Sequence, residues 1–230
     1  MKKIDIIILC GGLGSRIKSK SKNLPKILIE IKNRKPFILW LLKKLHSKKV
    51  NRIILSVGYR RKKLLDFIYK NKNLNLSYCI ENKRLGTGGA VRNVIKKKNI
   101  SNPFLVVNGD TYFNFNIDTF IKKYSLIKNY SFIMLKKAET EKRYDKFAIE
   151  NKKIVKHGKR SNIGKFINAG LYIFHKRDFK LKKNKFSIEN TVIPKLIDKN
   201  KLSYYINKSK VFYDIGTPKS LREFKNFIQN

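Results

Sequence analysis

The chain has 230 residues, enough for one α/β domain with a substantial core. It carries 55 Lys and Arg against 15 Asp and Glu, a formal net charge of +40. The basic residues are spread along the whole chain, which indicates a solvated basic surface and no nucleic-acid partner.

No apolar run of about 18 residues appears, so no membrane span is expected. Two cysteines, Cys10 and Cys79, at strand-like positions argue against a disulfide scaffold. We therefore expect a soluble cytoplasmic protein.

In the first half of the chain, short apolar runs alternate with helical patterns. Strands are predicted at Ile4–Cys10, Arg52–Val57, Leu76–Ile80 and Phe104–Asn108. Helices are predicted between them at Pro36–Lys48, Arg60–Lys70 and Gly88–Lys98. This β-α-β-α order predicts a parallel sheet with right-handed crossovers, in which ligands bind at the carboxyl ends of the strands.

The second half is richer in strands. They are predicted at Ser131–Leu135, Phe147–Glu150, Phe166–Phe174, Ser203–Ile206 and Val211–Tyr213. Helices are predicted at Ile188–Asp198, which Pro194 can kink or shorten, and at Pro218–Ile228. No repeat, linker or composition break divides the chain, so we expect a single domain.

A glycine-rich segment, Gly11-Gly12-Leu13-Gly14-Ser15-Arg16, follows the first predicted strand, with Pro25-Lys26 further on. Glycines permit positive φ and turn several N–H groups toward one point, which makes a nest for an anion. Arg16 and Lys26 add two cations suited to phosphate oxygens. The P-loop pattern is absent, and Ile17 stands where the dinucleotide fingerprint needs its third glycine. The segment predicts a polyphosphate site of another kind.

Asp110 is a candidate ligand for Mg²⁺. It ends the tripeptide Asn108-Gly109-Asp110, directly after a predicted buried strand. Chemistry at a triphosphate requires Mg²⁺, a hard ion that takes one or two carboxylates together with phosphate oxygens. The alternative for Asp110 is an ordinary turn aspartate. Asp214 lies at a second predicted strand-to-helix turn, ahead of Thr217-Pro218, which is typical of a helix N-cap and first helical residue.

A second glycine loop, Gly86-Thr87-Gly88-Gly89, opens the third predicted helix. Without side chains it can lie flat against a base or ribose. Glu81 stands just upstream, at the end of a predicted strand. A carboxylate only accepts hydrogen bonds, so it suits guanine, which presents N1–H and an amino group side by side. The alternative for Glu81 is a surface glutamate.

These segments, in this order, resemble the sugar-1-phosphate nucleotidyltransferases. The matching motifs are the first glycine loop, Pro25-Lys26, Leu85-Gly86-Thr87-Gly88-Gly89, Asn108-Gly109-Asp110, Asn168-Ala169-Gly170 and Asp214-Ile215-Gly216-Thr217-Pro218. Within that superfamily, the Leu9-to-Gly14 segment and the surroundings of Glu81 look most like the D-glycero-D-manno-heptose 1-phosphate guanylyltransferases. The resemblance runs from Ile4 to about Lys219. It implies a single nucleotidyltransferase domain over residues 1–230, with a Rossmann-like nucleotide-diphospho-sugar transferase fold. Such an α/β fold has a mostly parallel, mixed central sheet flanked by helices.

The resemblance also implies an activity: GMP passes from GTP to D-glycero-D-manno-heptose 1-phosphate by Mg²⁺-assisted in-line displacement, and the GDP-sugar supplies polysaccharide biosynthesis. Arg16 would contact the leaving phosphates, Lys26 the α-phosphate region and Lys159 the sugar phosphate. Asp110 and Asp214 would share the Mg²⁺. The nucleotide is expected on Gly11, Gly12, Gly14, Ser15, Glu81, Gly86, Thr87 and Gly88. The sugar is expected on Asn168, Gly170 and Glu189.

Some residues depart from the family pattern. Gly158 stands where a glutamate is usual, and Lys165 competes with Lys159 for the sugar phosphate. Other head groups in the same reaction class therefore stay open, namely mannose or glucose 1-phosphate, or phosphocholine with CTP. A non-catalytic nucleotide-sugar binding protein is a further alternative. The sequence also leaves a homo-oligomer open.

Overall fold

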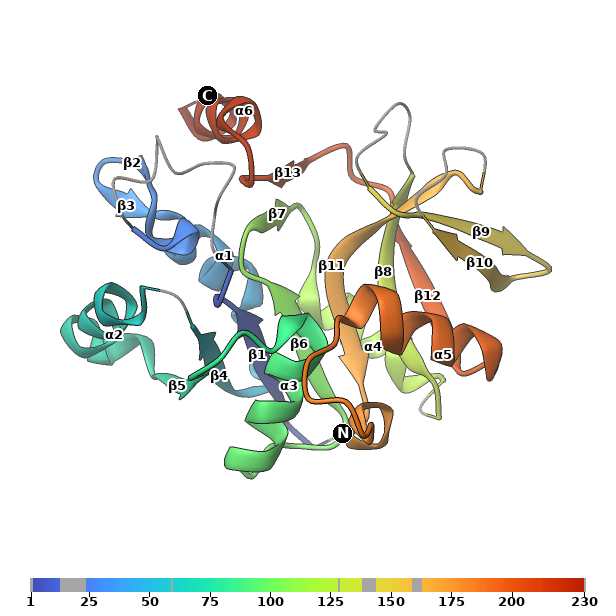
Figure 1. The fold of residues 1–230 in the computed structure, drawn as a ribbon. Coiled ribbons are helices and arrows are strands. Elements are labelled where there is room, and N and C mark those ends of the chain that lie inside the picture. Colours follow the sequence, from blue (N-terminus) through green and yellow to red (C-terminus); the bar gives the residue numbers. More distant parts are fainter. Residues whose placement is uncertain are drawn as a thin grey trace.

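A computed structural model describes residues 2–12, 24–58, 60–127, 129–137, 144–158 and 163–229. Its centre is a nine-stranded mixed sheet with helices on both faces (Figure 1). Within these residues, no helix has the length and apolar character that crossing a bilayer requires.

The amino-terminal half forms the parallel part of the sheet. Its strands are β1 (Ile4–Leu9), β4 (Val50–Val57), β5 (Leu76–Ile80) and β6 (Phe104–Asn108). They lie in the order β6-β1-β4-β5, and Ile7 of β1 pairs with Val106 on one side and with Ile54 on the other. Strands covered on both faces have nearly continuous apolar sequences, which is why the sequence located β1 and β6, both buried over nearly their whole length. The predicted bounds of β5 and β6 are confirmed, whereas β1 ends one residue early and β4 begins two residues early.

The carboxyl-terminal half supplies the other five strands of the sheet. They are β8 (Ser131–Lys137), β9 (Lys146–Glu150), β10 (Lys153–Gly158), β11 (Phe166–Phe174) and β12 (Leu202–Asn207). Strand β11 joins the two halves, because it runs antiparallel to β6 and also to β8 and β9. Strand β12 lies parallel to β8. The expected mixed sheet is therefore confirmed, and β10 is a strand that the sequence analysis did not predict.

Helices cover the sheet or connect its strands. The α-helices are α1 (Phe37–Leu45), α2 (Arg61–Lys70), α3 (Gly86–Lys97), α4 (Ile117–Ser125), α5 (Ile193–Asp198) and α6 (Pro218–Gln229). Short 3-10 turns occur at η2 (Lys26–Leu28), η3 (Lys72–Leu74) and η4 (Lys176–Phe179), and η5 (Ile188–Val192) is a π-helical turn. The predicted helix over 188–198 is thus divided, because Pro194 in the first turn of α5 has no N–H to continue the α-helical ladder backward. Helix α4 was not predicted.

Two small antiparallel pairs complete the fold: β2 (Glu30–Lys32) with β3 (Lys35–Pro36), and β7 (Thr111–Phe113) with β13 (Phe212–Asp214). In the second pair, Asp214 lies opposite Thr111. This pairing brings the turn after β13 back to the turn after β6. The predicted helix start at Thr217-Pro218 is confirmed, since Thr217 Oγ1 accepts a hydrogen bond from the Ser220 N–H and caps α6.

The core lies on both faces of the sheet, because successive strand side chains point to opposite sides. Ile6 and Ile8 of β1 join the cluster under α1, α2, α4 and α6. Ile7 joins the other cluster, with residues of α3 and α5, and Figure 1 shows these two helices in front of the sheet. The central strands are thereby fixed from both sides, and their carboxyl ends provide a rigid edge for the site.

Candidate active site

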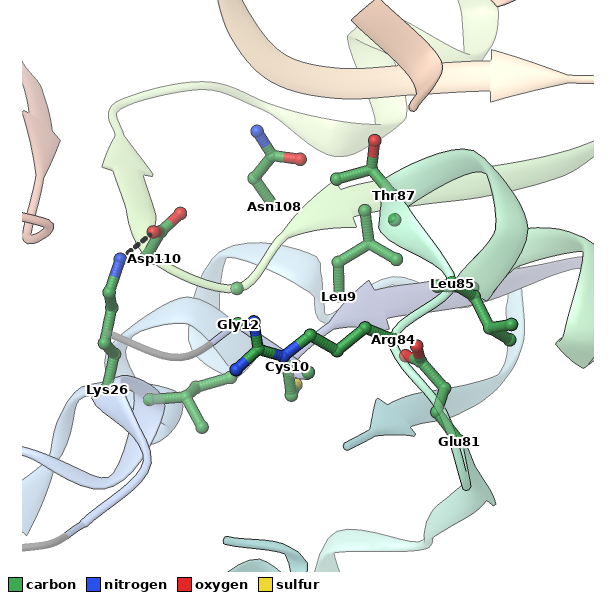
Figure 2. A pocket seen from close by; sticks show the side chains of 15 residues that line it. Leu9, Cys10, Gly12, Lys26, Glu81, Arg84, Leu85, Thr87, Asn108 and Asp110 are labelled. Atoms are coloured by element: carbon green, nitrogen blue, oxygen red, sulfur yellow. Dashed lines mark hydrogen bonds and ion pairs between the residues drawn. The ribbon is translucent and has the colours of Figure 1, made fainter. Parts of the chain in front are cut away.

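A cavity of about 400 Å³ opens at the carboxyl ends of β1, β5 and β6 (Figure 2). Four segments far apart in the sequence form its wall: the first glycine loop, the turn with Lys26, the segment from Glu81 into α3, and the turn after β6. Parallel strands place their following loops at one edge of the sheet, which is where such folds bind ligands. Of the predicted nucleotide-binding residues, Gly11, Gly12, Glu81, Gly86 and Thr87 line this cavity.

The first glycine loop lies against Glu81. A Cβ added to Gly11 would stand 2.8 Å from Glu81 Oε1, so a larger residue would push the carboxylate away. Gly12 also lines the cavity, and a Cβ there would meet no atom of the described residues within 4 Å. The predicted phosphate contacts Gly14, Ser15 and Arg16 lie outside the described residues, as does Lys159.

Glu81 presents an oriented carboxylate to the cavity. Ser56 Oγ donates a hydrogen bond of 2.9 Å to Glu81 Oε1, and the Leu85 N–H also donates to this carboxylate. Burial raises the pKa of Glu81, while these two donors act to lower it. The result is a half-buried acceptor whose position is set by neighbouring elements, so the surface-glutamate alternative does not describe it.

Cys10 also lines the cavity, and its side chain is buried. Burial, followed by the nearby Asp110 and Glu81 carboxylates, raises the pKa of the Cys10 thiol. The thiol therefore stays protonated at neutral pH, and a thiolate is the reactive form of cysteine.

Lys26 and Asp110 line the other end of the cavity, and the turn that holds Asp214 lies next to Asp110. Lys26 Nζ donates to Asp110 Oδ2 at 2.8 Å, the contact dashed in Figure 2. The Ile215 N–H donates to the Asp110 carbonyl at 2.9 Å, which brings the turn holding Asp214 beside Asp110. Asp214 Oδ1 accepts from the Gly216 N–H at 2.7 Å. A Cβ added to Gly216 would lie 2.6 Å from Asp214 Oδ1 and 3.5 Å from Lys26 Nζ.

This pair of aspartates suits Mg²⁺. Both supply carboxylate oxygens, and the Asp110 side chain is 33% exposed, so water and phosphate oxygens can reach it. The position already accepts a positive charge, that of Lys26. The described residues contain no cluster of three or more His, Cys, Asp or Glu that could form a metal site from protein groups alone. A two-carboxylate site completed by water and substrate phosphates is the arrangement that Mg²⁺ favours.

The second glycine loop packs on the segment before η5. Gly86 has φ +74°, and a Cβ there would lie 2.5 Å from the Phe186 carbonyl oxygen. The N–H groups of Gly88 and Gly89 donate to that oxygen at 3.0 and 3.1 Å. A Cβ on Gly88 would stand 2.4 Å from the Phe186 ring. Gly86 and Thr87 therefore line the cavity, whereas the structure gives Gly88 a packing role against Phe186.

Among the described residues that line the cavity, none is a predicted sugar-binding residue: Asn168, Gly170 and Glu189 lie behind its wall. Thr87 Oγ1 donates to Glu189 Oε2 at 2.8 Å, and burial raises the pKa of Glu189. Asn168 Nδ2 donates to Tyr172 Oη at 2.5 Å.

Gly170 lies against Asn108, which lines the cavity. The Gly170 N–H donates to Asn168 Oδ1 at 2.8 Å. Gly170 has φ +76°, and a Cβ on it would lie 2.9 Å from Asn108 Nδ2. Glu189 and Gly170 thus each contact a residue that lines the cavity, Thr87 and Asn108 respectively.

The sequence analysis missed several lining residues, including Leu9, Asn108 and Arg84. Figure 2 shows the Arg84 side chain extending across the cavity toward Gly12. Its one sequence signal is its place between Glu81 and the second glycine loop, which does not separate it from the other 54 basic residues. Lys165 is the alternative to Lys159 for contact with the sugar phosphate. It is an exposed residue directly before β11.

Comparison with known proteins identifies the family. The sequence model described as "Nucleotidyl transferase" matches residues 5–230. The chain belongs to the nucleotidyl transferase family. Two curated relatives are D-glycero-alpha-D-manno-heptose 1-phosphate guanylyltransferases. The one from Aneurinibacillus thermoaerophilus is 28% identical, with 99% of each chain covered. The one from Campylobacter jejuni is 32% identical, with 96% of this chain and 98% of the relative covered.

Solved structures agree with this assignment. The crystal structure of HddC from Yersinia pseudotuberculosis has a TM-score of 0.84 to this nucleotidyl transferase, at 31% identity over 98% of this chain and 99% of HddC. HddC complexed with GMP-PN has a TM-score of 0.82 at the same identity and coverage. The predicted family, the predicted fold class and the prediction of an enzyme are confirmed.

Proposed function

We propose that this nucleotidyl transferase moves GMP from GTP to D-glycero-D-manno-heptose 1-phosphate and releases pyrophosphate. The observation that carries the proposal is the Glu81 carboxylate, oriented at the wall of a cavity that also contains the glycine loop, Lys26 and Asp110. Support for guanine and heptose also comes from the two relatives named as heptose 1-phosphate guanylyltransferases and from the HddC complex with GMP-PN.

The base would be selected at Glu81. An ionised carboxylate accepts from the N1–H and the amino group of guanine, and it repels the acceptor edge of cytosine. Ser56 and Leu85 hold the carboxylate in place, so binding costs little reordering of this side chain. Gly11 leaves room for Glu81 against the loop.

The phosphates would lie between the first glycine loop and Lys26, with Arg16 on the leaving β- and γ-phosphates. An oxygen of the sugar phosphate attacks the α-phosphorus in line, and the bond from the α-phosphorus to the bridging oxygen of pyrophosphate breaks. The attacking oxygen is already anionic, so no general base is required. Catalysis then consists of positioning and charge neutralisation.

Asp110 and Asp214 would hold Mg²⁺, which when bound neutralises phosphate charge. On the sugar side, Glu189 and Asn168 would contact hydroxyl groups, and Lys159 or Lys165 the sugar phosphate. We propose a cytoplasmic enzyme, one domain over residues 1–230, that supplies a GDP-sugar to polysaccharide biosynthesis.

The aspartates give the direct test of this chemistry. Asp110→Asn and Asp214→Asn keep the side-chain shape but remove the charge, so each should lower kcat for pyrophosphate release at least about a hundredfold. Thermal unfolding should show that both variants remain folded. Asp118→Asn, on α4 and bonded to Ser47, is the control and should keep full turnover. Near-normal turnover by Asp110→Asn would contradict the assignment of Asp110 as a metal ligand.

A further inference from the structure

The ammonium group of Lys26 stands where the metal of the proposed reaction would bind. Its Nζ lies 2.8 Å from Asp110 Oδ2, and the Lys26 and Asp110 side chains are 16% and 33% exposed (Figure 2). The same Nζ approaches the turn of Asp214, 3.5 Å from where a Cβ on Gly216 would be. The Lys26 ammonium therefore already neutralises the Asp110 carboxylate.

We propose that the ammonium group of Lys26 occupies the metal position in the nucleotide-free protein. The ion pair with Asp110 keeps divalent cations out, and an ion enters when a triphosphate binds and takes Lys26 as its own partner. This inference rests on the proposed function, since it assumes that Asp110 is a metal ligand during the reaction.

Electrostatics supports this exchange of partners. An ammonium and a divalent cation repel each other, and this partly buried pair is less screened than a surface pair. If both bound Asp110 Oδ2 they would lie close together, and their repulsion makes this unfavourable. A triphosphate offers Lys26 several anionic oxygens, to which a lysine binds as a point charge. Moving Lys26 to those oxygens frees the carboxylate at the moment when phosphate oxygens also become available to the ion.

The backbone around Lys26 is fixed, so the exchange needs only a side-chain movement. Lys26 begins η2, where the Leu28 N–H donates to the Pro25 carbonyl and the Ile29 N–H donates to the Lys26 carbonyl. The next two side chains, Ile27 and Leu28, are buried. The flexible four-carbon stem of lysine can therefore swing between carboxylate and phosphate while the turn stays in place.

Both aspartates have polar partners among the described residues. Asp214 Oδ1 accepts from the Gly216 N–H within its own turn, and Tyr144 Oη donates to Asp214 Oδ2 at 3.3 Å. Asp110 Oδ2 accepts a hydrogen bond from Lys26 Nζ. Asp110 is thus the carboxylate that Lys26 masks, and removing the Lys26 charge should unmask it.

The test measures Mn²⁺ binding to the nucleotide-free protein, from the EPR signal of free Mn²⁺. Lys26→Met should bind Mn²⁺ at least about tenfold more tightly than the wild type, because it removes one positive charge at contact distance. Lys26→Arg keeps the charge and should bind as weakly as the wild type. Lys35→Met removes the same charge from an exposed position and should leave Mn²⁺ affinity unchanged. Adding Asp110→Asn to Lys26→Met should abolish the gain.

Equal Mn²⁺ affinity in the wild type and in folded Lys26→Met would overturn the inference. Thermal unfolding checks the fold, and Lys26→Gln is a second neutral variant should the methionine be poorly tolerated. If Asp110→Asn still loses turnover while Lys26→Met gains no affinity, this inference alone fails. If Asp110→Asn keeps turnover and no variant binds Mn²⁺, the metal site of the proposed function fails with it.

Discussion

Glu81 combines burial with two hydrogen-bond donors, and burial dominates its titration. Its pKa is raised above the ordinary glutamate value, although Ser56 and Leu85 act against that shift. A carboxyl group with a raised pKa takes up its proton at a higher pH than an exposed glutamate. Only the ionised form accepts both guanine donors. The raised pKa therefore raises the pH below which guanine binding is expected to weaken.

The pH profile of kcat/KM for GTP tests this role. As pH falls through the raised pKa of Glu81, the carboxylate becomes protonated and kcat/KM should decline. Glu81→Gln should lack this acid limb and should lower kcat/KM for GTP by about 10- to 100-fold, the loss of a hydrogen bond to a charged group. Glu150→Gln, at an exposed glutamate, is the control. An unchanged acid limb in Glu81→Gln would exclude Glu81 as its origin.

Arg84 is a second residue whose position in the cavity indicates a contact with the nucleotide. The structure pairs the carboxylates of the cavity with other groups, Glu81 with Ser56 and Asp110 with Lys26. The Arg84 guanidinium, which reaches across the cavity, is thus available to an anionic ligand. We expect Arg84→Gln to raise the KM for GTP about tenfold, the effect of one charge-assisted hydrogen bond. Lys83→Gln makes the same charge change at an adjacent exposed position, and a matching KM increase there would contradict a specific contact.

At the scale of elements, the sequence located those with strong periodicity and missed short or highly charged ones. Strand β10 (Lys153–Gly158) has one buried residue and includes two lysines, so it lacks an apolar signal. Its hairpin with β9 turns at Asn151 and Lys152, both with positive φ, without the glycine that usually marks such a turn. Strand β7 has only three residues, and α4 follows it after a three-residue gap. The apolar run through β7 therefore obscured the Asn116 N-cap.

The second glycine loop permits a prediction about packing. Alanine at Gly88 would place a Cβ 2.4 Å from the Phe186 ring. Gly88→Ala should lower the free energy of unfolding by about 1–3 kcal/mol, the usual cost of overpacking. Gly12→Ala is the matched control, because a Cβ there meets no atom of the described residues within 4 Å and should leave stability nearly unchanged. Urea unfolding measures both variants, and equal stabilities would refute the packing role of Gly88.

At the scale of the whole molecule, the site depends on contacts that no local pattern contains. The glycine loop, Glu81 and Asp110 follow three strands of one parallel sheet, so a shared edge could be predicted from their order. The position of Asp214 beside Asp110 depends on the pairing of β13 with β7, and β7 was not predicted from the sequence. The ion pair of Lys26 with Asp110 depends on a side-chain position, which composition and spacing do not specify.

The net charge of +40 should also influence the molecule as a whole. Like charges repel within a compact fold, and salt screens this repulsion over about 10 Å at 0.1 M. We expect the free energy of unfolding to rise by about 1 kcal/mol, or Tm by about 2–4 °C, between low salt and about 0.3 M KCl. Calorimetry in a buffer without phosphate measures this effect. A constant or falling Tm would show that charge repulsion does not limit stability.

The most direct test of the proposed function is a matrix of pyrophosphate-release assays. The four ribonucleoside triphosphates and dTTP would each be paired with heptose, mannose and glucose 1-phosphates and with phosphocholine, with Mg²⁺ or with EDTA. We predict release only with GTP and D-glycero-D-manno-heptose 1-phosphate, and none in EDTA. Release with a different pair would contradict the assigned specificity, and release that persists in EDTA would contradict the metal site at Asp110 and Asp214.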